Sequence, residues 1–178
     1  MKSQMPICWI NGAFGVGKTT TARELKKQWR DAFCFDPEQI GFMLRKVVPR
    51  NCRTDDFQDL RLWRELTVAT LISLSENCEQ PIIVPMTLVV PQYFDEVVGE
   101  LRRKKVEIHH FTLVASRNTL TKRNNRRWLL PQAKRWVRDQ MERCVSALES
   151  PVFNVHVQTE NRNVTEIVKE IRSQLPDV

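Results

Sequence analysis

Short apolar runs alternate along the chain with longer amphipathic stretches. The continuous apolar runs lie at residues 7–10, 32–35, 81–86, 107–114 and 155–159. Their length and their content of β-branched residues predict buried strands. Between them, apolar residues recur at helical spacing at 19–29, 37–48, 60–74, 91–101, 119–127 and 164–175. This alternation predicts a single α/β domain, residues 1–178, with a five-stranded parallel sheet and helices on both faces.

The turn after the first predicted strand carries a glycine-rich motif that fits G-x-x-x-x-G-K-[ST], the P-loop pattern, at residues 12–19. Glycines let backbone N–H groups surround a phosphate, the lysine reaches the β- and γ-phosphates, and the Thr19 hydroxyl holds Mg²⁺. A helix start at this point adds its positive dipole end. We therefore predict the three-layer fold of P-loop nucleoside-triphosphate hydrolases, with ATP and Mg²⁺ as cofactors. The predicted cofactor-binding residues are Gly12, Ala13, Phe14, Gly15, Val16, Gly17, Lys18, Thr19 and Thr20.

Phosphoryl transfer also needs a carboxylate near the acceptor or metal and positive charge on the transferring phosphate. Asp36 ends the second predicted strand, at the edge where the P-loop lies, and is the candidate base or Mg²⁺-linked carboxylate; an N-cap role is the alternative. Arg123 and Arg127 follow the fourth strand in a predicted arginine-rich lid, residues 117–143. The predicted catalytic residues are Lys18, Asp36, Arg123 and Arg127.

A mixture of aromatic and charged residues after the second strand predicts the acceptor pocket. The predicted substrate-binding residues are Asp36, Phe42, Arg45, Asp56, Phe57, Trp63 and Arg64. Core packing is the alternative for Phe42 and Trp63. The stretch 159–161, after the fifth strand, is predicted to contact the adenine ring.

The net charge of +7 comes from 28 basic and 21 acidic residues. Nine of the basic residues and two of the acidic ones lie within 117–143, which favours a polyphosphate partner over nucleic acid; a solvated basic face is the alternative. We find no apolar run of membrane-spanning length and no signal segment, and so expect a cytoplasmic protein without a transmembrane segment. The five cysteines include no C-x-x-C pair and are predicted to be packed thiols.

Several segments in this order resemble the tunicamycin-resistance ATP-binding protein family: WINGAFGVGKT, DPEQIGFMLR, DDFQDLRLWR, IIVPMTLVVPQYFDEVVG, HHFTLVAS and SPVFNVHVQT. The resemblance spans nearly the whole chain. It implies a nucleotide-kinase-like fold and protection against tunicamycin, a uracil-nucleoside antibiotic. By position, it implies that Gly12, Gly17, Lys18 and Thr19 bind ATP and Mg²⁺, that Asp36 lies at the acceptor site and that Arg123 belongs to the lid.

The leading hypothesis is thus a small-molecule kinase that transfers the γ-phosphoryl group of ATP to a nucleoside-like compound. One alternative is ATP-dependent sequestration of the antibiotic without chemistry, and another is a kinase of an endogenous nucleoside or nucleotide. Nucleic-acid binding is disfavoured because no recognition module accompanies the basic segment. The sequence leaves open whether the protein is a monomer or a homodimer.

Overall fold

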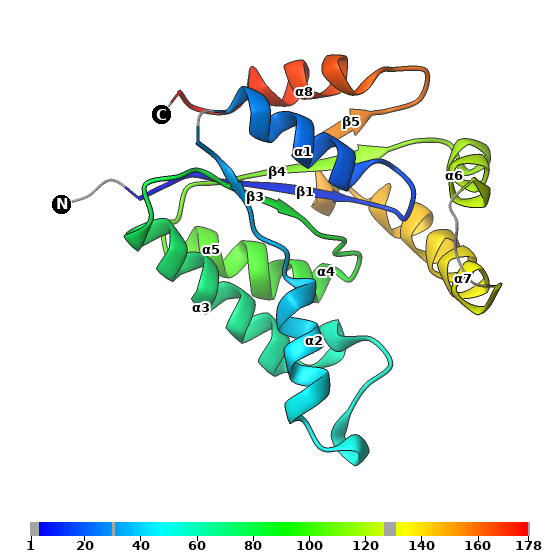
Figure 1. The fold of residues 1–178 in the computed structure, drawn as a ribbon, viewed down its shortest axis with the longest axis horizontal. Helices are drawn as coiled ribbons and strands as arrows, with labels where there is room; N and C mark the ends of the chain where they lie inside the picture. Colours follow the sequence, from blue (N-terminus) through cyan, green and yellow to red (C-terminus); the bar gives the residue numbers. More distant parts are fainter. Residues whose placement is uncertain (1–3, 30, 127–130, 178) are drawn as a thin grey trace.

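The computed structural model describes residues 4–29, 31–126 and 131–177. Five strands form one sheet in the order β2-β3-β1-β4-β5, and every neighbouring pair is parallel (Figure 1). The strands are β1 Ile7–Gly12, β2 Phe33–Cys34, β3 Ile82–Pro85, β4 Ile108–Val114 and β5 His156–Gln158. The predicted strands are confirmed to within two residues at each end.

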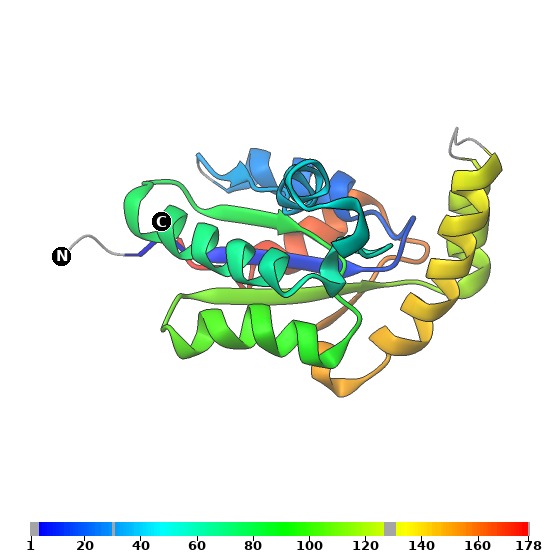
Figure 2. The same ribbon diagram turned by 90° about the horizontal axis from the view of Figure 1, so that it is seen from below.

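Helices cover both faces of this sheet, as Figure 2 shows from below. Helices α1 (Lys18–Gln28) and α8 (Val164–Arg172) pack together on one face. Helix α3 (Arg61–Asn77) and the α4–α5 segment (Pro91–Phe94, Glu100–Arg103) lie on the other, with α2 (Glu38–Val47) beside α3. Helices α6 (Arg117–Asn125) and α7 (Pro131–Leu148) stand beyond the carboxyl ends of the strands. The three-layer α/β prediction is therefore confirmed.

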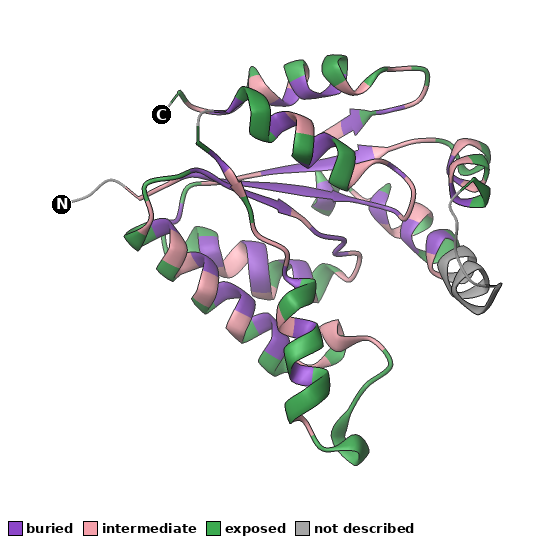
Figure 3. Ribbon diagram, viewed as in Figure 1, coloured by how far each residue is buried: buried purple, intermediate pink, exposed green. Residues whose placement is uncertain are grey.

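The core lies around the central strand. All six residues of β1 are buried, with Ile7 paired to Ile82 on one side and Ile108 on the other. Figure 3 shows the buried sheet against a largely exposed α2. A strand buried on both faces is mostly apolar, which explains the continuous run at residues 7–10.

The stretch 91–101, predicted as one regular helix, contains a π-helical segment, Asp95–Gly99, between α4 and α5. Arg103 bonds the backbone oxygen of Asp95 with Nη2 (3.0 Å) and its carboxylate with Nη1 (3.0 Å). These bonds satisfy polar groups where the regular i→i−4 pattern is interrupted. In the described part of the chain, none of the helices combines the length and apolarity that a membrane span requires.

Candidate functional site

The P-loop joins the end of β1 to the start of α1. Gly12, Gly15 and Gly17 have φ values of 142°, 83° and 111°, a region that residues with a Cβ avoid. At Gly12 a Cβ would lie 2.7 Å from Val16 Cγ1 and 2.8 Å from the Leu113 oxygen, so this glycine permits close approach to β4. At Gly17 a Cβ would meet no atom within 4 Å, so the loop opens toward free space there.

The amino end of α1 suits an anion. No side chain caps it, and its first turn contains no acidic residue. Its first amide groups therefore face an anion site without a competing carboxylate. Lys18 Nζ lies at the loop itself, 2.8 Å from the Gly12 oxygen and 3.1 Å from the Ala13 oxygen. Together with the glycine conformations, these features fit the phosphates of ATP.

A cavity of about 810 Å³ extends from the P-loop toward both edges of the sheet. Of the predicted cofactor-binding residues, those from Phe14 to Thr20 line the cavity. Gly12 and Ala13, at the start of the loop, are not among the lining residues. The remaining lining residues come from α1 and the end of β3 near the loop, from the β2–α2 segment on one side, and from α6 and the β5–α8 segment on the other: Thr21, Ala22, Arg23, Cys34, Asp36, Glu38, Pro85, Thr87, Arg123, Thr159, Arg162, Val164 and Ile167. Since β1 lies between β2 and β5 in the sheet, the cavity has a β2 end and a β5 end on either side of the P-loop.

Two carboxylates occupy the β2 end. Asp36 Oδ1 accepts a bond from the Glu38 amide (3.0 Å), so Asp36 stabilises the start of α2 and lines the cavity as well. Burial raises the pKa of Glu38, and the charges of Asp36 and Asp56 add to this, while Lys18 acts in the opposite direction. The sequence analysis did not predict Glu38 as a site residue, although it lies only two residues after Asp36. The two side chains offer proton acceptors opposite Lys18.

Arg123 lies at the β5 end. Its Nη1 donates to the Val16 oxygen (3.2 Å) and to Thr159 Oγ1 (3.1 Å), and its Nη2 donates to the Thr159 oxygen (2.9 Å). The guanidinium thus joins α6 to the P-loop and to the turn after β5 while lining the cavity. Arg127 lies outside the described residues.

Comparison with known proteins agrees with this geometry. The sequence model of the AAA domain family matches residues 7–151. The chain belongs to this family. No curated protein matches the sequence.

Among solved structures, the tunicamycin resistance protein of Deinococcus radiodurans is 28% identical, covers 95% of this chain and 94% of its own, and has a TM-score of 0.77. The resemblance seen in the sequence is thereby confirmed. A gluconokinase from Sinorhizobium meliloti is 18% identical over 96% of this chain and 90% of its own, with a TM-score of 0.58. The APS kinase of Mycobacterium tuberculosis in complex with AMPPNP and APS is 13% identical over 97% and 98%, with a TM-score of 0.67. This AAA domain protein therefore has a kinase-like P-loop fold.

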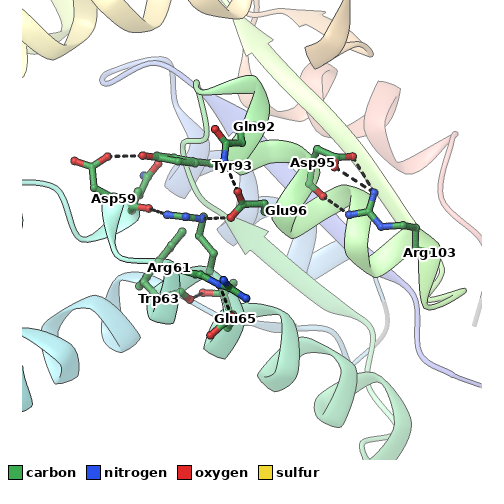
Figure 4. Close-up of polar contacts among 12 residues, drawn as sticks. Asp59, Arg61, Trp63, Glu65, Gln92, Tyr93, Asp95, Glu96 and Arg103 are labelled. Atoms are coloured by element: carbon green, nitrogen blue, oxygen red, sulfur yellow. Dashed lines mark hydrogen bonds and ion pairs between the residues drawn. The ribbon is translucent and has the colours of Figure 1, made fainter.

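Two predicted substrate-binding residues of this AAA domain, Trp63 and Arg64, are buried. The indole of Trp63 is fully buried and donates to the Pro37 oxygen (3.0 Å). Arg64 is 7% exposed; its guanidinium pairs with Glu96 (2.5 Å) and lies 4.1 Å from the centroid of the Tyr93 ring. Figure 4 shows Glu96 also bonded to Gln92, and Tyr93 to Asp59. These contacts place Trp63 and Arg64 outside the cavity lining, and their contact with a substrate stays a prediction.

Arg45 of α2 lies near Asp56 and Phe57, which belong to the turn packed on that helix. A Cβ at Gly41 would lie 2.6 Å from the Phe57 ring, so that ring packs directly on the helix, and Arg45 is 5.8 Å from its centroid. Burial raises the pKa of Asp56, whose Oδ1 caps the Phe57–Asp59 turn. Phe42 is 46% exposed on the outside of α2. Of the seven predicted substrate-binding residues, Asp36 alone belongs to the cavity lining.

Other residues that shape the site escaped the sequence reasoning. Asn11 is fully buried and bonds the Gly12 amide (2.8 Å) and both the amide and the carbonyl of Leu88. Thr87 donates to the Gly12 oxygen (2.9 Å) and lines the cavity. Cys34, predicted as a packed thiol, is exposed and lines the cavity. For these residues, the only signal in the sequence was the polar side chain of Asn11 directly after the apolar run at residues 7–10.

Proposed function

We propose that this protein is a small-molecule kinase that transfers the γ-phosphoryl group of ATP to a hydroxyl of a nucleoside-like compound. The observation that carries the proposal is the arrangement of the cavity: a glycine-rich loop and an uncapped helix start face two carboxylates across the same space. Tunicamycin is the first acceptor to test, because the similar protein from Deinococcus radiodurans is a tunicamycin resistance protein.

The residues divide the work between the two ends of the cavity. The P-loop amides, the start of α1 and Lys18 hold the polyphosphate of ATP and stabilise the charge that develops on it. At the β5 end, Val164 and Ile167 offer apolar surface to the base, and Thr159 and Arg123 offer polar groups. Thr19 is the residue of the loop that would hold Mg²⁺, which neutralises phosphate charge when bound. Within the described residues, no group of three or more His, Cys, Asp or Glu side chains could hold a metal ion by itself.

At the β2 end, Asp36 accepts the proton of the acceptor hydroxyl. The hydroxyl oxygen forms a bond to the γ-phosphorus while the bond from that phosphorus to ADP breaks. Glu38 lies on the same first turn of α2 and binds a further hydroxyl of the acceptor. Arg123 stabilises the charged transition state from the other end, through the P-loop that it contacts.

The first experiment is mass spectrometry of tunicamycin after incubation with the purified protein, ATP and Mg²⁺. We expect the mass to rise by one phosphoryl group with the wild-type protein and to stay unchanged with Lys18→Ala. An unmodified drug that co-purifies with the protein only when ATP is present would contradict the kinase and identify a sequestering protein. An unmodified drug that does not bind would exclude tunicamycin as the substrate.

A further inference from the structure

The carbonyl groups of the P-loop are held by side chains from other elements. A loop that turns its amide groups toward an anion turns carbonyl groups away from it, and these need donors when they are buried. Thr87 donates to the Gly12 oxygen (2.9 Å), Arg123 to the Val16 oxygen (3.2 Å) and Asn124 Nδ2 to the Phe14 oxygen (2.9 Å). Two of these three donors come from consecutive residues of α6.

Asn124 is an unusual residue for its surroundings. It is 8% exposed, and within the described residues its buried Oδ1 has no hydrogen-bond partner. A leucine of similar size would avoid the cost of that unpaired oxygen. The polar contact that this amide makes with the loop is made by its Nδ2. That atom donates to the Phe14 oxygen and lies 3.5 Å from the sulfur of Met141 on α7.

The same side chain also limits the space around Gly15. A Cβ on Gly15 would lie 2.5 Å from Asn124 Oδ1, so the amide occupies the position that a side chain at residue 15 would need. Asn124 thus contacts the loop at two successive residues, through a hydrogen bond at Phe14 and through packing at Gly15. Since the loop is fixed from behind at this point, its amides can face the cavity without rearrangement when a phosphate binds.

We propose that Asn124 is a positioning residue that holds Phe14 and Gly15 in the phosphate-binding conformation. This inference rests on the proposed function, because it assumes that the P-loop binds the polyphosphate of ATP. Asn124 does not line the cavity, and it acts through the loop backbone. Its contact with Met141 also joins the P-loop to α7.

The test compares Asn124→Leu and Asn124→Asp with the same changes at Asn125, the exposed neighbour on α6. Binding of ATP and of inorganic tripolyphosphate is measured by calorimetry. In Asn124→Leu we expect both affinities to fall by the same factor, about five- to tenfold, because one neutral hydrogen bond to the loop is lost. Asn124→Asp should lower both affinities further, because its carboxylate also adds a negative charge beside the loop. The Asn125 variants bind as the wild-type protein does. If Asn124→Leu does not fold, Asn124→Ser removes the same bond with a smaller side chain and should show the same loss.

A spectroscopic measurement separates positioning from general stabilisation. The backbone amide signals of residues 14–17 should move in the ¹⁵N–¹H spectrum of the ligand-free Asn124→Leu protein and stay in place in Asn125→Leu. Wild-type affinity together with unmoved signals in the Asn124 variants would overturn the inference and leave the proposed function intact. A wild-type protein that binds neither ATP nor tripolyphosphate would instead overturn the proposed function on which it rests.

Discussion

The two sides of the cavity are built differently. On the phosphate side, the P-loop is held by four donors from three places in the chain, Lys18, Thr87 and the α6 pair Arg123 and Asn124, and its glycines have conformations that few other residues adopt. The acceptor side is the β2 end of the cavity, where we propose that the acceptor binds. Here the outer face of α2 leaves Phe42, Met43 and Val47 46%, 46% and 66% exposed, and the β2–α2 segment lines the cavity with Cys34, Asp36 and Glu38. A polyphosphate is the same ligand in every ATP-binding protein, so its site can be rigid. Acceptors differ from one kinase to another. We infer that a few side chains on the sparsely packed β2–α2 segment determine which acceptor this site binds.

The largest expected effect comes from breaking the rigid side with a matched pair of substitutions. Gly12→Ala places a Cβ 2.8 Å from the backbone oxygen of Leu113, and should lower the free energy of unfolding by about 3–4 kcal/mol. Gly17→Ala meets no atom, so its cost should be limited to about 1–2 kcal/mol of backbone strain.

Whereas Gly12→Ala should reduce stability more, Gly17→Ala should reduce ATP affinity more. The new methyl group of Gly17→Ala enters the space where the loop opens toward the cavity, so ATP affinity should fall at least about tenfold, as for the loss of one charge-assisted contact. Urea unfolding and calorimetry measure the two quantities. Equal losses of stability in the two variants would show that the loop is not packed against β4 as described.

A smaller effect on stability is expected from replacing Arg64, whose contacts support the acceptor side. Arg64→Met removes a buried guanidinium that holds Glu96, whose side chain is 33% exposed, and the Gln58 oxygen, and should cost about 2–3 kcal/mol of unfolding free energy. Arg61 offers a matched control four residues before Glu65 on the same helix, because its ion pair is 82% and 53% exposed. Arg61→Met should change stability by less than about 0.5 kcal/mol.

The same variant also tests whether the two sides are independent. Arg64 contacts neither the P-loop nor the cavity, so ATP affinity of Arg64→Met should equal that of the wild-type protein. A loss of ATP affinity comparable to that of Gly17→Ala would show that the phosphate side depends on the acceptor side, against the comparison drawn above.

The sequence predicted the phosphate side better than the acceptor side for a physical reason. The P-loop, the end of β1 and the start of α1 are contiguous, and local backbone chemistry determines their structure. The capping box of α8, Asn163 with Glu166, was visible for the same reason. Thr87 and Asn124, in contrast, reach the loop from distant segments, and only the tertiary structure brings them there. The sequence did not place Trp63 and Arg64 outside the cavity lining, because aromatic and charged residues in a short stretch look alike whether they face a ligand or the core.

The smallest expected effect concerns Glu38 and distinguishes function from stability on the acceptor side. Folding raises the pKa of this carboxyl, chiefly by burial, so the folded state favours its protonated form. The ionised carboxylate therefore destabilises the fold at neutral pH. Glu38→Gln should raise the free energy of unfolding there, by less than about 1 kcal/mol because the side chain is partly open to solvent.

The pH dependence follows from the same shift. The gain in unfolding free energy of Glu38→Gln should develop as pH rises from the pKa of Glu38 in the unfolded chain, about 4.3, through its higher pKa in the folded protein. At lower pH the gain should vanish, because Glu38 is protonated in both states. Urea unfolding of both proteins at several pH values measures it. The position of Glu38 in the cavity lining agrees with its proposed role in binding the acceptor. Glu38→Gln should therefore gain stability, keep its ATP affinity and bind the acceptor more weakly; if acceptor affinity is unchanged, Glu38 does not contact the acceptor.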